Sequence, residues 1–173
     1  MVHARGSAPR DLPASSRPDT SGRWQRLLRG QQSEVRQLRR WLAALLPDSP
    51  ERDDLTSVAV ELATNAIQHT ASGQSGWFTV ELACDGHVAW IAVTDEGGPG
   101  APRPSHDPLS DCGRGLVIVQ ALAQSWGVRG DSRGRTVWAE VACPAAAPAR
   151  PDAFPDGFLS RAVRCWACTV TDG

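Results

Sequence analysis

Glu61 and Asn65 stand four residues apart in a stretch whose apolar residues recur at helical spacing. Residues four apart on an α-helix lie about 6 Å apart along its axis and share one side. A Glu carboxylate there can orient or deprotonate a hydroxyl or a water molecule, and an Asn oxygen can ligate Mg²⁺. The pair can therefore meet a ligand held between the helix and a loop. The alternative is a solvated surface pair, which is the commoner role of Glu-x-x-x-Asn on a helix.

Asp95 is the second candidate, because it ends an apolar predicted strand and is followed by Glu96-Gly97-Gly98-Pro99-Gly100. Glycine lets the backbone approach a ligand closely, and strand ends beside such loops are favoured ligand positions. A carboxylate in that pocket can accept a hydrogen bond from the exocyclic amine of adenine. The alternative is an ordinary turn that ends the strand.

Two glycine-containing segments complete the set of candidates. Gly113-Arg114-Gly115-Leu116 opens a predicted helix, whose free N–H groups and positive dipole end suit a phosphate, and Arg114 could add a charge. Gly134-Arg135-Thr136 precedes the last predicted strand. Thr136 could donate its hydroxyl at the base end of a nucleotide, or be a plain strand residue.

Hydrophobic spacing predicts the elements that must position these residues. We expect strands at 24–29, 76–83, 87–94, 126–129 and 136–141, the second and third forming a hairpin. Helices are predicted at 33–46, from 50 to about 71, and at 115–125. Ser49 fits the N-cap of the second helix, with Pro50 in its first turn. The Pro- and Gly-rich segment 95–112 is long enough to be a functional loop.

The composition excludes several classes of protein. With 173 residues and 41% hydrophobic residues, the chain suits one soluble domain. It has no apolar run long enough to span a bilayer and no secretory signal, so we expect a cytoplasmic protein. All 18 basic residues are Arg, and the absence of Lys excludes a P-loop, a Schiff-base lysine and the catalytic lysine of ordinary protein kinases.

The five cysteines predict no metal site. In a chain without an export signal, free thiols are the default. The pair Cys165 and Cys168 forms a single C-x-x-C, and no second pair or nearby His supplies the four ligands that zinc needs.

Charge and composition divide the chain into three parts. We expect a disordered basic lead at 1–22, a folded domain at 23–143, and a Pro/Ala linker with a C-terminal extension at 144–173. Residues 1–40 carry nine Arg against three acids, whereas residues 41–143 carry six Arg against thirteen acids. The basic end could touch nucleic acid, but the chain has no recognition helix and its domain is acidic, so we expect no direct nucleic-acid partner.

The order of these motifs resembles the GHKL ATPase family, the Bergerat-fold proteins. Residues 61–69 are similar to the N-box of that family, 95–100 to its first glycine box and 112–116 to its second, within a resemblance that covers about 24–142. The resemblance implies a two-layer α/β sandwich, with a mixed, mostly antiparallel sheet, helices on one face, and ATP between the helices and a lid.

Within this family the chain resembles the small anti-sigma-factor serine/threonine kinases of bacterial partner-switching systems. The resemblance implies Mg²⁺ and ATP as cofactors, and a sigma factor and an anti-sigma-factor antagonist as partners. It also implies Glu61 as catalytic base, Asn65 as Mg²⁺ ligand and Asp95 as adenine reader. It assigns the shaping of the pocket and phosphate site to Gly97, Gly113 and Gly115.

The first helix is the expected protein-binding element. By the same resemblance, Arg36 would contact a protein partner, and this helix, which also bears Trp41, would build a homodimer unless Trp41 is a core residue. The glycine box departs from Asp-x-Gly-x-Gly, because Pro99 stands at its last position. Proline removes an N–H and fixes φ, so some ATP affinity could be lost.

Two further readings follow from these observations. The altered glycine box leaves open a nucleotide-binding interaction module that sequesters a partner without phosphorylating it. The catalytic part of a histidine kinase would need an upstream phosphoacceptor helix pair, for which residues 1–32 are too short and too rich in Pro and Gly.

Overall fold

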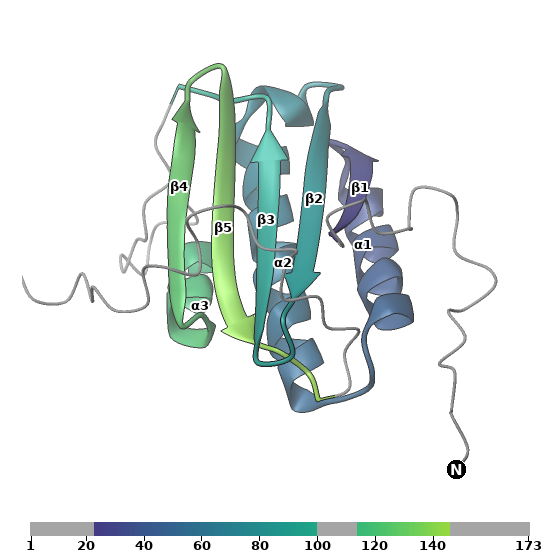
Figure 1. Ribbon diagram of the computed structural model, residues 1–173. Helices are drawn as coiled ribbons and strands as arrows, with labels where there is room; N and C mark the ends of the chain where they lie inside the picture. The colour runs from purple at the N-terminus through teal and green to yellow at the C-terminus, as the bar shows by residue number, and fades with distance from the viewer. Residues whose placement is uncertain (1–22, 100–113, 146–173) are drawn as a thin grey trace, which may run out of the picture.

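The computed structural model describes residues 23–99 and 114–145. Along the chain, its elements are β1 (Trp24–Arg29), α1 (Gln32–Leu45), α2 (Pro50–His69), the short 3-10 helix η2 (Ala71–Gly73), β2 (Trp77–Cys84), β3 (Val88–Asp95), α3 (Arg114–Leu122), β4 (Ser125–Asp131) and β5 (Gly134–Ala142). The strands form one sheet in the order β1-β2-β3-β5-β4. Helices α1, α2 and α3 lie on one face of that sheet (Figure 1), which confirms the predicted two-layer α/β architecture.

The four strand pairings of the described sheet are all antiparallel. The sheet was expected to be mixed, but no parallel pair occurs among these strands. The reason lies in the connections. β2 and β3 are joined as a hairpin, β4 and β5 as another, and β5 rather than β4 lies beside β3.

Helix α2 begins and ends through local hydrogen bonds. The Ser49 side chain accepts from the backbone N–H of Arg52 at 3.3 Å, with Pro50 as the first helical residue, as the sequence predicts. At the other end the helix stops at His69, two residues before the predicted end. Thr70 Oγ1 donates to the Ala66 carbonyl at 2.6 Å and accepts from Ser72 N at 3.2 Å, so the chain turns directly into η2.

The core lies between the helices and the facing side of the sheet. Alternation along β3 sends Ala89, Ile91 and Val93 into this core and Trp90 and Ala92 to the other face. The facing helices contribute buried residues that include Leu38, Leu42, Leu55, Leu62 and Val119. Since Asp95 continues the odd-numbered series, β3 delivers its terminal carboxylate to the helix-covered side of the sheet.

Trp41 belongs to this core. Its side chain is buried within the main hydrophobic cluster, so Trp41 is a core residue and not a surface residue. The homodimer expected through α1 therefore has no support from Trp41.

The end of α3 and the turn between β4 and β5 differ from the predicted ones. Helix α3 ends at Leu122 rather than 125, because Gln124 N already donates to Glu140 O at 2.8 Å and Ser125 pairs with Glu140. The β4–β5 turn is shorter than 130–134, since Arg133 N donates to the Asp131 carboxylate at 2.8 Å and closes the turn at residues 132 and 133. Apart from the end of α2, the remaining predicted helices and strands agree with the structure to within about one residue.

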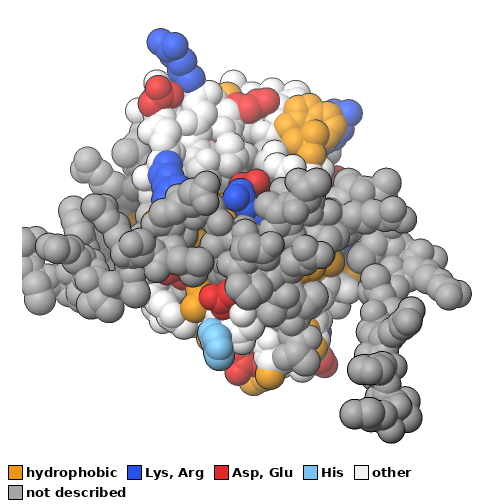
Figure 2. Space-filling view, viewed as in Figure 1, with side chains coloured by type: hydrophobic (Ala, Val, Ile, Leu, Met, Phe, Trp, Pro, Cys, Tyr) orange, Lys and Arg blue, Asp and Glu red, His pale blue; other side chains and the backbone are white. Residues whose placement is uncertain are grey.

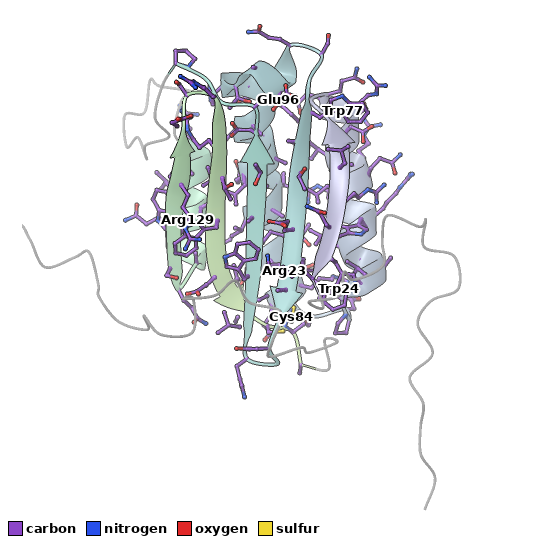
Figure 3. All side chains as sticks on the ribbon, turned by 45° about the horizontal axis from the view of Figure 1, so that its top comes forward. Arg23, Trp24, Trp77, Cys84, Glu96 and Arg129 are labelled. Carbon is purple, nitrogen blue, oxygen red and sulfur yellow. The ribbon has the colours of Figure 1, made fainter. Side chains whose placement is uncertain are left out.

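The face of the sheet that the helices leave uncovered carries aromatic and charged groups. Arg29 lies over the Trp77 ring at 4.4 Å and Arg129 over the Trp138 ring at 5.8 Å. Trp77 and Arg129 are labelled in Figure 3, at opposite sides of the sheet. Figure 2 shows apolar and basic side chains together at the upper corner on the β1–β2 side.

Several predictions fall on residues that the structure does not describe. They are the lead 1–22, the loop from residue 100 onward with Gly113, and the C-terminal extension from residue 146 onward with Cys165 and Cys168. Within the described residues, no helix combines the length and the apolar run that crossing a membrane requires.

Candidate functional site

Asn65 presents a buried polar atom that the described residues leave unbonded. Its side chain is half-buried on α2, beside the stripe that contacts the sheet, and its Nδ2 atom is buried with no hydrogen-bond partner among them. A buried amide N–H without an acceptor costs free energy, and such groups in native proteins normally have a partner. Within the described residues, Asn65 therefore keeps an amide donor without an acceptor.

Glu61 lies one turn before Asn65 and meets the first turn of α3. A Cβ built on Gly115 would stand 2.4 Å from Glu61 Oε2, so only a residue without a side chain leaves the carboxylate where it is. The first turn of a helix has backbone N–H groups without intrahelical acceptors. The structure thus brings Glu61 and Gly115 together, with exposed Arg114 beside them.

Leu116 is 2% exposed and its side chain packs in the main core, so it anchors α3, and a part in phosphate binding would fall to its backbone N–H. Gly113 lies outside the described residues.

The electrostatics of Glu61 suit proton transfer. Burial raises the pKa of its carboxyl above the usual range, and the positive charge of Arg39 on α1 partly offsets that rise. A carboxylate whose pKa moves toward neutrality is a better general base at neutral pH than an exposed one.

Asp95 is held in a tight turn with Gly97. The Asp95 side chain is 7% exposed, and its Oδ1 accepts from Gly97 N at 2.7 Å. Gly97 has φ of 77°, and a Cβ at this position would stand 2.2 Å from the Ser132 carbonyl oxygen. Burial raises the pKa of Asp95, while the Gly97 N–H and the charge of Arg135 act in the opposite direction.

This glycine turn is fastened to the C-terminal end of α2. Ala71 N donates to Gly97 O at 2.7 Å, and a Cβ on Gly98 would stand 2.6 Å from His69 O. Ser72 Oγ accepts from Glu96 N at 3.0 Å. Glu96 is labelled in Figure 3 near the end of β3. Pro99 is exposed and takes no part in these contacts, so the altered position of the glycine box lies beyond them.

The site therefore runs along one helix. Glu61 meets α3, Asn65 follows one turn later, and the glycine turn borders His69. Eight residues separate Glu61 from His69, which corresponds to about 12 Å of helix. Among the described residues no group of three or more His, Cys, Asp and Glu side chains gathers to hold a metal, so a cation here would depend on Asn65 and on ligand oxygens.

Thr136 does not join this site. Directly paired residues in an antiparallel sheet share a face, and Thr136 pairs with Thr94 whereas Arg135 pairs with Asp95. The two threonine hydroxyls lie 2.8 Å apart on the face away from the helices. The residue beside Asp95 is Arg135, which is 7% exposed and donates through Nη2 to Gly98 O at 3.1 Å. Sequence reasoning passed over Arg135, because the register between β3 and β5 decides which side chain of Gly134-Arg135-Thr136 meets Asp95.

A family model described as a histidine kinase-like ATPase domain matches residues 28–141, which is more than half of the chain. The chain belongs to the histidine kinase-like ATPase family. This is a GHKL-type family of ATP-binding, kinase-like ATPase domains. The fold described above agrees with this assignment. No curated protein gives a significant match to this chain.

Proposed function

We propose that this protein is an ATP-dependent serine/threonine protein kinase of the anti-sigma-factor kind. It would act in the cytoplasm, phosphorylate a small antagonist protein and sequester a sigma factor, and so regulate transcription. The order of polar groups along α2 carries the proposal. Glu61 contacts the start of α3, Asn65 follows with an unbonded buried nitrogen, and the turn that holds Asp95 borders the end of the helix.

Asp95 would bind the adenine. Its Oδ1 accepts from Gly97 N, and its second carboxylate oxygen has no hydrogen bond within the described residues. A carboxylate is an acceptor only, so it complements the exocyclic amine of adenine. Gly97 and Gly98 leave the backbone of the turn without side chains at this end of the site.

Asn65 and the first turn of α3 would hold the metal and the phosphates. The Asn65 side-chain oxygen is a suitable ligand for Mg²⁺, which keeps several waters and takes the rest of its ligands from phosphate. The N–H groups and positive dipole end of α3, a nine-residue helix, suit phosphate, and Arg114 stands at its first position. Bound ATP would supply the phosphoryl group that is transferred.

Glu61 would act as the catalytic base. It would take the proton of a Ser or Thr hydroxyl in the antagonist as that oxygen bonds the terminal phosphorus and ADP leaves. The proton ends on the Glu61 carboxylate. The raised pKa of this half-buried carboxyl supports the role, because it strengthens the base at neutral pH.

The exposed face of α1 would contact the protein partners. Arg36, Arg39 and Arg40 are all exposed on this helix. A basic helix face favours partners with acidic surfaces and accelerates their association at low salt. Arg36 remains the predicted contact residue.

The alternative is an ATP-binding interaction module without kinase activity. Pro99 at the last position of the glycine box is the observation that favours it, since proline lacks the N–H that glycine would offer there. On this alternative, Glu61→Ala would change neither ATP binding nor partner binding.

The test has two stages. Thermal unfolding with Mg-ATP, Mg-ADP or neither should show stabilisation by about 2.7 kcal/mol at a hundredfold excess over Kd, which is lost in Asp95→Ala. Purified antagonist proteins from the same organism are then incubated with γ-labelled ATP and wild-type protein, Glu61→Ala, or the control Asp54→Asn on the same helix. Label on a Ser or Thr with wild type and the control, and none with Glu61→Ala, is expected of the kinase. Nucleotide binding without transfer to any antagonist supports the interaction module.

A further inference from the structure

Asp95 and Arg135 form a pair of buried charges at the base end of the site. They are directly paired across β3 and β5, and each is 7% exposed. Within the described part of the chain, they are the two charged side chains that are buried. Burying a guanidinium costs free energy unless its charge and its donors are satisfied, so this placement calls for a physical explanation.

The contacts of Arg135 supply that explanation. Its Nη2 donates to Gly98 O at 3.1 Å, and the neighbouring Gly97 N donates to Asp95 Oδ1 at 2.7 Å. The guanidinium and the carboxylate thus hold two successive residues of one turn. No direct ion pair joins the two side chains among the contacts of the described residues. Among the described residues, the second oxygen of Asp95 therefore accepts no hydrogen bond.

We propose that Arg135 is a positioning residue of the nucleotide site: it fixes the glycine turn through Gly98 and supplies the positive charge that keeps Asp95 an acceptor for the base. This inference rests on the proposed function, because it assigns the adenine to Asp95. It places no contact between Arg135 and the nucleotide.

The electrostatics favour this role for Arg135. Burial raises the pKa of Asp95, and Arg135 is the charged group whose field lowers it. The other charged or titratable residues that border the turn, Glu96, His69 and Arg133, have exposed side chains, so solvent screens them. If Asp95 were protonated, one of its oxygens would be a donor, and it would match the exocyclic amine of adenine less well.

Two substitutions separate the charge of Arg135 from its hydrogen bond. Arg135→Lys keeps the positive charge but changes the geometry of the hydrogen-bond donors. Arg135→Gln keeps a hydrogen-bond donor but removes the charge. Arg133→Gln is the matched control, because it removes one positive charge from an exposed side chain next to the same turn.

The experiment measures ADP affinity from acid to mildly alkaline pH by calorimetry for the wild type and these variants. Wild-type affinity should fall as the pH drops and Asp95 takes up a proton. In Arg135→Gln this fall should occur at higher pH, with roughly tenfold weaker binding near neutrality. Arg135→Lys should keep the wild-type pH dependence with lower affinity, and Arg133→Gln should match the wild type.

The outcomes distinguish this inference from the function on which it rests. If Arg135→Gln and Arg135→Lys both match the wild type while Asp95→Ala does not bind, Arg135 has no positioning role and the nucleotide site stands. If wild-type protein fails to bind ADP at any pH, both proposals fall. If Arg135→Gln does not fold, Arg135→Lys tests whether the hydrogen bond to Gly98 positions the turn. Unchanged ADP affinity in Arg135→Lys would show that this hydrogen bond has no positioning role.

Discussion

Gly115 lies against Glu61 so closely that a Cβ on residue 115 would stand 2.4 Å from the Glu61 Oε2 atom. The atom in the way is the far end of a flexible side chain, whereas the backbone around Gly115 is free of such a clash. A side chain at this position would therefore move the carboxylate and leave the fold intact.

Gly115→Ala should separate activity from stability. We expect its midpoint of thermal unfolding to equal or exceed that of wild type, since alanine favours helix over glycine. Phosphoryl transfer should fall by about tenfold or more, because a base displaced by an ångström loses its alignment. Calorimetry and a labelled-ATP assay on the same sample check both. A variant that unfolds early, or that transfers at the wild-type rate, would contradict the packing described here.

Gly97→Ala should behave in the opposite way. Gly97 has φ of 77°, and its Cβ would meet the Ser132 backbone carbonyl at 2.2 Å, which cannot move without the β4–β5 turn. We expect a loss of at least about 1–2 kcal/mol of unfolding free energy, the cost of the left-handed conformation alone. Urea denaturation measures it. Gly134→Ala, whose Cβ would stand 3.8 Å from the nearest atom, is the control and should cost less.

The pH dependence of phosphoryl transfer should report Glu61. Burial raises the pKa of this carboxyl, and below that pKa the base is protonated and inactive. The rate should therefore fall as the pH decreases, beginning at a higher pH than for an exposed Glu. Arg39→Gln removes the charge that opposes the rise, so its rate should fall at a still higher pH. A rate profile identical to that of wild type would show that Arg39 does not act on Glu61.

The sequence predicted the framework of this site because each of its parts has a local signal. The Ser49 cap, the helical spacing through Ala66 and the nearly continuous apolar run of β3 are encoded by neighbouring residues, and they place Glu61, Asn65 and Asp95 on the correct elements. Trp41 was ambiguous because an amphipathic helix does not show whether its large aromatic residue faces the core.

The base end of the site was harder to predict because it depends on register. The Gly134-Arg135-Thr136 segment contains two candidate side chains that point to opposite faces of the sheet. Which of them meets Asp95 is decided by the pairing of β3 with β5, two strands far apart in the chain. A shift of one residue in that pairing would have exchanged their roles.

Asp95→Asn should lose nucleotide binding and raise the stability of the fold at neutral pH. A carboxyl whose pKa is raised in the folded state stabilises the fold below its unfolded pKa, and that contribution is lost as the pH rises through the folded value. At neutral pH the buried charge is therefore a net cost, and Asn removes it while keeping an acceptor for the Gly97 N–H. We expect a higher midpoint of unfolding at neutral pH, with no gain at acid pH, and lost stabilisation by Mg-ATP. A lower midpoint at neutral pH would show that the ionised carboxylate supports the turn.

Thr136→Val tests the assignment of the two faces. Its hydroxyl lies 2.8 Å from that of Thr94 on the face away from the helices, and both side chains are half-buried, so solvent can replace the lost partner. Valine has nearly the same shape and suits a strand. We therefore expect ADP affinity and its pH dependence to match those of wild type, while Arg135→Gln one residue earlier changes both. Weaker ADP binding by Thr136→Val would mean that the nucleotide reaches the opposite face, and the register between β3 and β5 would then have to differ from the one described.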